Sequence, residues 1–167
     1  MRGSLPIIIL FLSCALLGSC SLKTGFETSP QIYAGYFICN EHSPLTRDTL
    51  QIISSGYVVT VDSVNKGDTV SVLISAAGIS NPLRSIQVNW DKQGLILEIE
   101  DTTKLYEGLL PSSSCLNGTL NFQEDVYGCT FKMHYIPKIS YSQQIDITVS
   151  SDSKYSPIKA TVIQNVR

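Results

Sequence analysis

Apolar and polar residues alternate with a period of two through most of the chain after residue 30. The alternation is clearest from Thr69 to Ala77, where one face carries Val70, Val72, Ile74 and Ala76. Because successive side chains of a β-strand point to opposite faces, this pattern predicts a strand with one buried face. No segment sustains the helical period over three turns. We therefore expect an all-β chain.

Weaker versions of the same pattern predict further strands over residues 31–39, 50–53, 57–64, 84–90, 95–99, 119–122, 129–136, 144–150 and 158–166. In the first, strict alternation places Ala34 and Tyr36 on one face and Tyr33 and Phe37 on the other. Many short strands with turn residues between them favour an antiparallel β-sandwich.

Two of these strands are predicted to form a hairpin. The turn Asp91-Lys92-Gln93-Gly94, with a positive φ expected at Gly94, would join residues 84–90 to residues 95–99. Ile86, Val88 and Trp90 share one face of the first strand. Burying the opposite, polar face would be costly, so we expect Trp90 to lie between the two sheets.

Residues from about 55 to 167 resemble the immunoglobulin-like domains of exported bacterial proteins. The resemblance rests on residues 66–72 as the first core strand, 85–90 as the third, and 144–153 with 158–166 as the last two. It implies an immunoglobulin-like antiparallel β-sandwich. The Cys…Trp…Cys spacing of antibody domains is absent. Whether residues 31–54 join the sandwich is left open.

The first 19 residues are typical of an export signal. Arg2 precedes an apolar stretch from Leu5 to Leu17 that is too short to span a bilayer. The stretch ends in Leu17-Gly18-Ser19-Cys20, which resembles a bacterial lipobox. That resemblance implies cleavage before Cys20, lipidation of its sulfur and a firm membrane anchor. The alternative is an ordinary signal peptide that ends in a chance cysteine.

The chain therefore divides into a lipoprotein signal peptide at 1–19, a polar tether at 20–30 and a β-sandwich domain at 31–167. As a whole it resembles small cell-envelope lipoproteins of the Bacteroidetes type. In such lipoproteins an Asp after the lipidated cysteine favours the inner membrane, whereas Ser21 here implies the outer membrane. The acidic cluster typical of surface-exported members is replaced by Ser21-Leu22-Lys23-Thr24. The periplasmic and the surface face both stay open.

Three cysteines remain in the body of the mature chain, namely Cys39, Cys115 and Cys129. An exported chain permits disulfides, and a Cys115–Cys129 bond would close a short loop. The other two pairings stay open, and one thiol is always left over. Metal binding is not expected because no Cys-x-x-Cys occurs and His42 and His134 lie far apart. No cofactor is expected.

Composition excludes some classes of function. Only 16% of residues are charged, the net charge is −2, and no Lys/Arg run occurs, which argues against a nucleic-acid partner. His42 and His134 are expected on the surface, and no Gly-x-Ser-x-Gly motif is present. The carboxylate pairs Glu98/Glu100 and Glu124/Asp125 are expected to be solvated. We therefore expect that the protein is not an enzyme.

Two kinds of surface residue are singled out. Tyr141 and Tyr155 lie in Ser-rich loops and are the candidates for an exposed binding role. Thr49, Ser63, Thr69 and Thr102 each follow an Asp, in a pattern that resembles the O-glycosylation sequon of Bacteroidetes. Ordinary turn chemistry at strand starts is the alternative.

The sequence thus favours a non-catalytic lipoprotein of the cell envelope, attached to the membrane by its lipid, that binds a glycan or a protein. The alternative is a structural or assembly subunit that adds a strand to a neighbour. A contiguous exposed aromatic patch would favour the first role, and a long, uncharged, unpaired edge strand the second.

Overall fold

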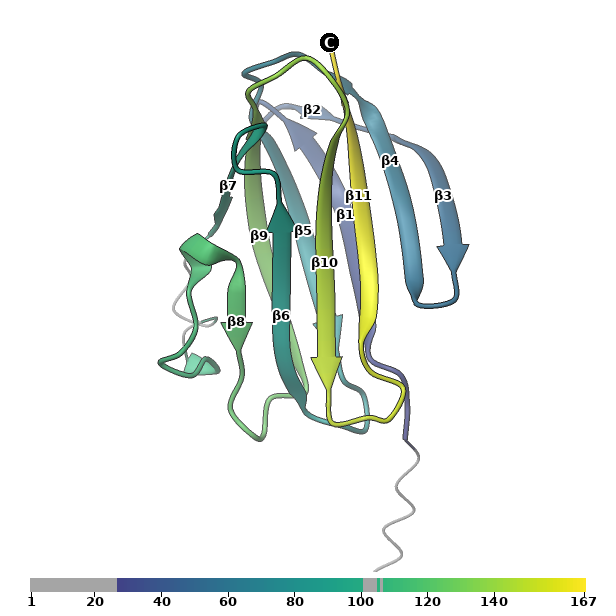
Figure 1. The fold of residues 1–167 in the computed structure, drawn as a ribbon, viewed down its shortest axis with the longest axis vertical. Helices are drawn as coiled ribbons and strands as arrows, with labels where there is room; N and C mark the ends of the chain where they lie inside the picture. The colour runs from purple at the N-terminus through teal and green to yellow at the C-terminus, as the bar shows by residue number, and fades with distance from the viewer. Residues whose placement is uncertain (1–26, 101–104, 106) are drawn as a thin grey trace, which may run out of the picture.

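The computed structural model describes residues 27–100, 105 and 107–167, which form a sandwich of two β-sheets (Figure 1). Sheet A contains, in spatial order, β2 (Ser43–Pro44), β1 (Gln31–Cys39), β5 (Val70–Ala77), β9 (Gly128–Pro137) and β7 (Leu95–Ile99). Sheet B contains β3 (Arg47–Ile53), β4 (Gly56–Val64), β11 (Ile158–Val166), β10 (Gln143–Ser151), β6 (Leu83–Trp90) and β8 (Thr119–Asn121). A 3-10 turn, η1 (Cys115–Asn117), precedes β8.

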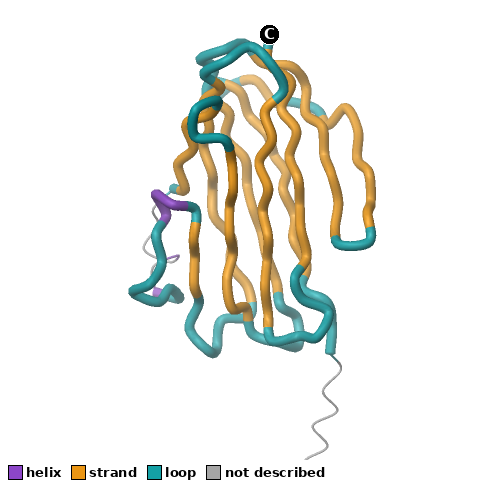
Figure 2. Tube along the Cα trace, viewed as in Figure 1, coloured by secondary structure: helices purple, strands orange, loops and turns teal. Residues whose placement is uncertain are grey.

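The strand order is immunoglobulin-like. Neighbouring strands are antiparallel except β4, which lies parallel to β11. The order β1-β5-β9-β7 facing β6-β10-β11 matches the two sheets of an immunoglobulin domain. The predicted all-β, immunoglobulin-like sandwich is therefore confirmed, and Figure 2 shows that strands and loops make up almost all of the described chain. Residues 31–54 supply β1, β2 and β3.

The core lies between the sheets and follows the period-two pattern. Val70, Val72 and Ile74 of β5 are fully buried, as the sequence predicts. They lie opposite β9 residues that are also buried, namely Tyr135, Met133 and Phe131. Sheet B contributes the other half of the core through residues that include Val59, Ile86, Val88, Ile145, Ile147, Val149 and Val162.

The predicted hairpin between residues 84–90 and 95–99 is wrong. β6 pairs with β10 and β8 in sheet B, whereas β7 pairs with β9 in sheet A, so residues 91–94 cross from one sheet to the other. Gly94 does not have positive φ. Glycine fits here for another reason: the Gln143 side chain packs against the Gly94 backbone, and a Cβ on residue 94 would lie 2.3 Å from Oε1 of Gln143. Turn composition does not specify the sheet of the second strand, and a short connection spans the gap of about 10 Å between stacked sheets.

Trp90 is only partly buried, contrary to the expectation of a ring between the sheets. It is the last residue of β6, and its ring lies at the margin of the core against Gly118, where an added Cβ would be 2.8 Å from Cζ3 of Trp90. Lys92 Nζ lies 5.3 Å from the centroid of the Trp90 ring. Periodicity predicts the correct face, but a strand end has too few neighbours to enclose a ring of this size.

Candidate functional site

The β3 strand is the most exposed part of the sandwich. All seven of its residues are exposed, and its only strand partner in the described chain is β4. Figure 1 shows the β3–β4 hairpin extending beyond the body of the two sheets. Leu50 is 54% exposed and Ile52 is 82% exposed. β3 is therefore an edge strand with apolar side chains in solvent.

The free edge of β3 is unusual for a soluble domain. An edge strand presents unpaired N–H and C=O groups, which natural proteins protect with charge, Pro or very short strands. In the described chain the strands at the other sheet edges are shorter, with two residues in β2, three in β8 and five in β7. Arg47 and Asp48 begin β3, but residues 49–53 carry no charge. The second half of β3 is therefore a free sheet edge without charge.

Arg47, Leu50 and Ile52 lie on one face of the hairpin. Each is directly opposite a β4 residue whose side chain is directed toward sheet A, namely Val61, Val59 and Tyr57. Directly opposite residues of an antiparallel pair share a face. Val59 and Val61 are fully buried, whereas Arg47, Leu50 and Ile52 on β3 are exposed.

Two side chains of the hairpin hold it against β1. Tyr57 Oη accepts a hydrogen bond from the Ala34 N–H at 2.6 Å, and Arg47 Nη2 donates one to the Ala34 carbonyl at 3.1 Å. Both polar groups of Ala34 are thereby satisfied at an edge of sheet A. The hairpin is fixed to the body through these bonds, while the far edge of β3 remains available.

A pair of exposed tyrosines lies on β1 next to Arg47. The register of β1 shifts between Gly35 and Ile38, and Tyr36 has a φ of 54°. This bulge adds a residue, so Tyr33 and Tyr36 are both exposed, while Ala34 and Phe37 are buried. The predicted alternation, with Ala34 and Tyr36 on one face, is therefore wrong at this point.

These tyrosines form a small cluster with the arginine. The ring centroids of Tyr33 and Tyr36 lie 6.3 Å apart in an edge-to-face arrangement, and Cζ of Arg47 lies 5.0 Å from the Tyr33 centroid. Aromatic faces with one cation provide apolar contact together with polar groups at the rim. We call Arg47, Leu50, Ile52, Tyr33 and Tyr36 the docking surface.

Two carboxylates lie at the beginning of β3. Asp62 accepts hydrogen bonds from the Thr46 hydroxyl and from the Thr46 N–H, the latter at 2.8 Å, and these bonds lower the pKa of Asp62. A hydrogen bond with Asp62 raises the pKa of Asp48. In the part of the chain that the structure describes, no group of three or more His, Cys, Asp or Glu residues is placed to hold a metal ion.

A serine, a histidine and a glutamate meet on the outer face of sheet A. Ser71 Oγ lies 2.8 Å from Nδ1 of His134, and Nε2 of His134 lies 3.8 Å from a carboxylate oxygen of Glu100. Ser71 and His134 border a depression of about 400 Å³. A hydrolytic triad needs N–H donors directed at the oxyanion, but the N–H groups of an antiparallel ladder bond to neighbouring strands. The 3.8 Å separation also exceeds hydrogen-bond distance. This cluster lacks the geometry for acyl transfer.

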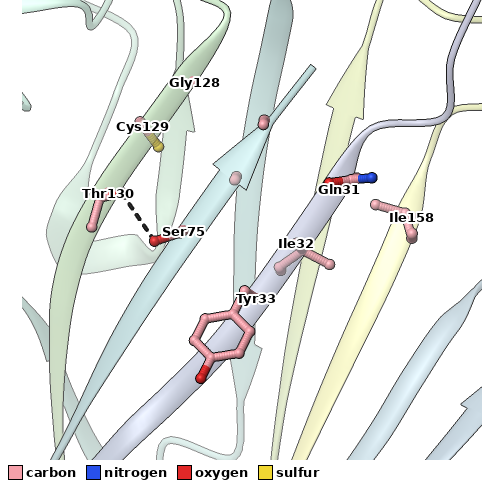
Figure 3. A pocket seen from close by; sticks show the side chains of 10 residues that line it. Gln31, Ile32, Tyr33, Ser75, Gly128, Cys129, Thr130 and Ile158 are labelled. Carbon is pink, nitrogen blue, oxygen red and sulfur yellow. Dashed lines mark hydrogen bonds between the residues drawn. The ribbon is translucent and has the colours of Figure 1, made fainter. Parts of the chain in front are cut away.

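A depression that crosses β1, β5 and β9 has no charged residue in its lining. It has a volume of about 730 Å³, and Ile158 of β11 also contributes to the lining (Figure 3). Ser75 and Thr130, which contribute hydroxyl groups to its lining, hydrogen-bond to each other at 3.0 Å. Tyr33 lies at its margin and so links it to the docking surface. The lining of this depression has no charged residue, so it suits apolar and hydrogen-bonding contacts with a ligand.

The structure separates Tyr141 from Tyr155. Both are exposed, at 60% and 56%, but Tyr141 precedes β10 and Tyr155 follows it. A strand of nine residues spans about 30 Å, so the two rings lie at opposite ends of the sandwich and cannot share one small ligand.

Cys115 and Cys129, one of the three possible disulfide pairings, are not bonded to each other. Cys115 lies in η1 beside β8 of sheet B, whereas Cys129 lies in β9 of sheet A. The chain between them passes through the short β8 of sheet B before it returns to sheet A, so proximity in sequence does not bring the two thiols together. Burial raises the pKa of the Cys129 thiol to about 12.

The predicted modification positions differ in accessibility. Thr49 is exposed on β3, whereas Ser63 and Thr69 are half-buried. Thr102 and the predicted lipidation residue Cys20 lie outside the described residues. Among the described residues, no helix is long and apolar enough to cross a bilayer.

No family model and no curated protein matches this chain. Among solved structures, it is similar to a conjugative transposon lipoprotein from Bacteroides eggerthii, with 12% identity and a TM-score of 0.41 over 78% of this chain and 97% of that one. It is also similar to a family 123 glycoside hydrolase from Clostridium perfringens, with 14% identity and a TM-score of 0.42, over 66% of this chain and 23% of the hydrolase.

A third similar structure is the PapD-like domain 7 of human CEP192, with 7% identity and a TM-score of 0.35 over 84% of this chain and 88% of that one. At these values the three likenesses assign no function. The function of this chain is therefore inferred from its strand order and from the geometry of the docking surface.

Proposed function

We propose that this chain is a lipid-anchored protein of the bacterial outer membrane that binds a partner protein by β-strand addition at β3. The free edge of β3, with Leu50 and Ile52 exposed beside it, is the observation that carries the proposal. A strand that pairs with this edge gains main-chain hydrogen bonds, and its alternate side chains cover the docking surface. Full burial of an Ile or Leu side chain contributes about 1.5–3 kcal/mol.

The anchor part of the proposal is supported by the sequence Leu17-Gly18-Ser19-Cys20 after an apolar stretch. Replacing Cys20 with Ala should remove the acyl chains, which supply the affinity for the bilayer. We expect Cys20→Ala protein either to leave the detergent phase in phase separation or to keep its uncleaved signal peptide, whereas Cys39→Ala protein is cleaved and stays in the detergent phase. Correctly cleaved Cys20→Ala protein that remains membrane-bound would contradict the anchor.

Binding rather than catalysis is supported by the chemistry of the surface. The docking surface contains aliphatic and aromatic side chains with a single arginine, and neither depression beside it holds an assembled catalytic group. The choice of a protein partner follows from the main-chain groups of β3, because a glycan cannot continue a β-sheet.

The test combines cross-linking with amide exchange in the full-length protein. A photoreactive residue in place of Gln51 captures the partner in the producing bacterium, and the purified complex is then analysed by hydrogen exchange. We expect new protection of the residue 47–53 amides in the complex. Protection elsewhere with none in β3 would overturn the proposal.

A matched pair of variants tests the same point by affinity. Ile52 is 82% exposed on β3, and Leu116 is 81% exposed on η1. Ile52→Lys should weaken binding about tenfold or more, which corresponds to about 1.4 kcal/mol. Leu116→Lys should leave the affinity within about twofold. Equal losses in the two variants would show that β3 has no special role.

Glycan binding is the second candidate, favoured by the edge-to-face pair Tyr33 and Tyr36 next to Arg47. Sugar rings pack on exposed aromatic faces. If this were the function, Tyr33→Ala would abolish retention on the glycan, while Ile52→Lys would have no effect. Strand addition instead predicts that Ile52→Lys weakens partner binding more than Tyr33→Ala does.

A further inference from the structure

Three loops gather at the end of the sandwich where β1 begins. They are the β5–β6 loop (residues 78–82), the loop before β9 (residues 123–127) and the β10–β11 loop (residues 152–157). Gly78 N–H donates to the Tyr127 carbonyl at 2.8 Å, and Asp152 N–H donates to the Pro82 carbonyl at 3.1 Å. In Figure 1 this is the lower end of the molecule. We call these three loops the tether end.

The chain enters the sandwich through this end. Thr28 Oγ1 lies 2.8 Å from Ser80 Oγ, and Glu27 accepts a hydrogen bond from the Lys154 N–H at 3.2 Å. Seven residue steps separate Cys20 from Glu27, so the connection spans at most about 25 Å. A lipid on Cys20 would therefore hold the tether end close to a bilayer.

Each of the three loops presents a large apolar or aromatic side chain to solvent. Ile79 is 48% exposed, Tyr127 is 50% exposed and Tyr155 is 56% exposed. Ile79 has a φ of 59°, a conformation that is strained for a β-branched residue. The backbone thus holds an isoleucine outward at the point where Thr28 passes.

The charges of the tether end are mixed. Arg84 forms an ion pair with Asp152, and Lys154 Nζ lies 3.8 Å from Glu27. Lys154 also lies over the Tyr155 ring at 5.2 Å from its centroid. Glu124 and Asp125 add two further negative charges in the loop before β9. The end thus has no excess of positive charge that would favour anionic lipid.

We infer that the tether end rests on the bilayer, with Ile79, Tyr127 and Tyr155 in the neutral headgroup region of the phospholipid. Tyr is suited to this region because its ring is apolar and its hydroxyl is polar, and Lys154 can extend its ammonium group into water. The inference rests on the lipid anchor proposed above. The inference adds an orientation of the domain relative to the bilayer. The tether end contacts the membrane, and the free edge of β3 lies at the side of the sandwich, away from the membrane surface.

The opposite end provides a control that is matched in exposure. Tyr141 there is 60% exposed, close to the value for Tyr155, and its loop lies beside β6–β7 through the Lys138 N–H bond to the Gly94 carbonyl. With Trp90 replaced by Phe, a tryptophan at either position becomes the single fluorescent probe. The full, lipidated protein is placed in neutral phosphatidylcholine vesicles that contain lipid with a nitroxide at the fifth acyl carbon.

We expect Tyr155→Trp fluorescence to fall about twofold in these vesicles and Tyr141→Trp fluorescence to be almost unchanged, because interfacial side chains reach about 5–10 Å into the bilayer boundary. Tyr127→Trp is a second probe of the tether end should the first variant fail to fold. Flotation of the vesicles measures the anchor separately. Protein that floats but shows equal quenching at 155 and 141 overturns the orientation alone, whereas protein that does not float overturns the anchor and the orientation together.

Discussion

The hydroxyl of Tyr135 donates a hydrogen bond of 2.7 Å to Oε1 of Gln164 inside the sandwich. Tyr135 lies on β9 of sheet A and Gln164 on β11 of sheet B, and both side chains are fully buried. The amide of Gln164 in turn donates to the carbonyls of Asp62 and Asn165. One polar chain thus connects the two sheets through an otherwise apolar core.

Removing the Tyr135 hydroxyl should be costly for this reason. Tyr135→Phe leaves Oε1 of Gln164 buried without its donor, and we expect a loss of about 1–3 kcal/mol in the free energy of unfolding in urea. Tyr127→Phe, at an exposed position, is the control. A double variant Tyr135→Phe/Gln164→Met should lose less than the sum of the two single changes. Strict additivity would show that the two groups do not interact.

The second prediction concerns the attachment of the β3–β4 hairpin. Tyr57→Phe removes the oxygen that accepts the Ala34 N–H, so we expect a loss of about 1 kcal/mol in stability. Amide exchange should quicken most at Ala34 and along the hairpin. An unchanged exchange rate at Ala34 would mean that water replaces the hydroxyl at no cost.

The third prediction concerns the start of the parallel pair β4–β11. Gly56 has a φ of 144°, and a Cβ there would lie 1.7 Å from the Lys159 carbonyl oxygen. Gly56→Ala should therefore destabilise the fold by at least about 1 kcal/mol more than Gly67→Ala. Gly67 is a suitable control because it also has positive φ but has open space around it. Equal effects of the two changes would rule out the steric explanation.

The fourth prediction is a pH dependence at the β4–β5 turn. The side-chain amide of Asn40 and then the Asn65 N–H donate to Asp68 and hold its pKa below the ordinary 3.8. A carboxyl with a lowered folded-state pKa stabilises the fold above its unfolded pKa, and this stabilisation is lost as the pH falls through the folded pKa. Urea midpoints measured from about pH 6 down to about pH 2 should fall less for Asp68→Asn than for the wild type. Asp125→Asn, in a different loop, should follow the wild type. The same slope for Asp68→Asn and the wild type would contradict the prediction.

Sequence patterning predicts the strands well but not their neighbours. The alternation in β5 and β10 identifies their buried faces correctly, because burial of alternate residues is a local property of one strand. The pairing of β6 and β7 with different strands is not local. Both have one apolar face, and nothing in residues 91–94 distinguishes a hairpin from a crossing between sheets.

The candidate site could not be predicted from the sequence for related reasons. Strict alternation on β1 hides the bulge at Tyr36, because one inserted residue reverses the faces of all residues before it relative to those after it. In β3, Leu50 and Ile52 alternate in the way expected of a half-buried strand. Their exposure depends on the place of β3 at the edge of sheet B, which only the three-dimensional arrangement shows. Ile53 lies on the opposite face from Leu50 and Ile52, and an apolar residue on both faces is a sequence feature that distinguishes β3 from an ordinary half-buried strand.

The place of β11 has a consequence for how the molecule is assembled. The last strand in the chain lies between β4 and β10, so sheet B stays in two pieces until residues 158–166 arrive. β4 is synthesised long before its partner β11, and pairings between strands that are distant in sequence form slowly. Sheet A depends on β9 instead, because β9 joins β5 to β7, and this sheet is complete once Pro137 is in place. Until residues 158–166 are in place, the β3–β4 hairpin therefore has two open edges, and β11 closes one of them.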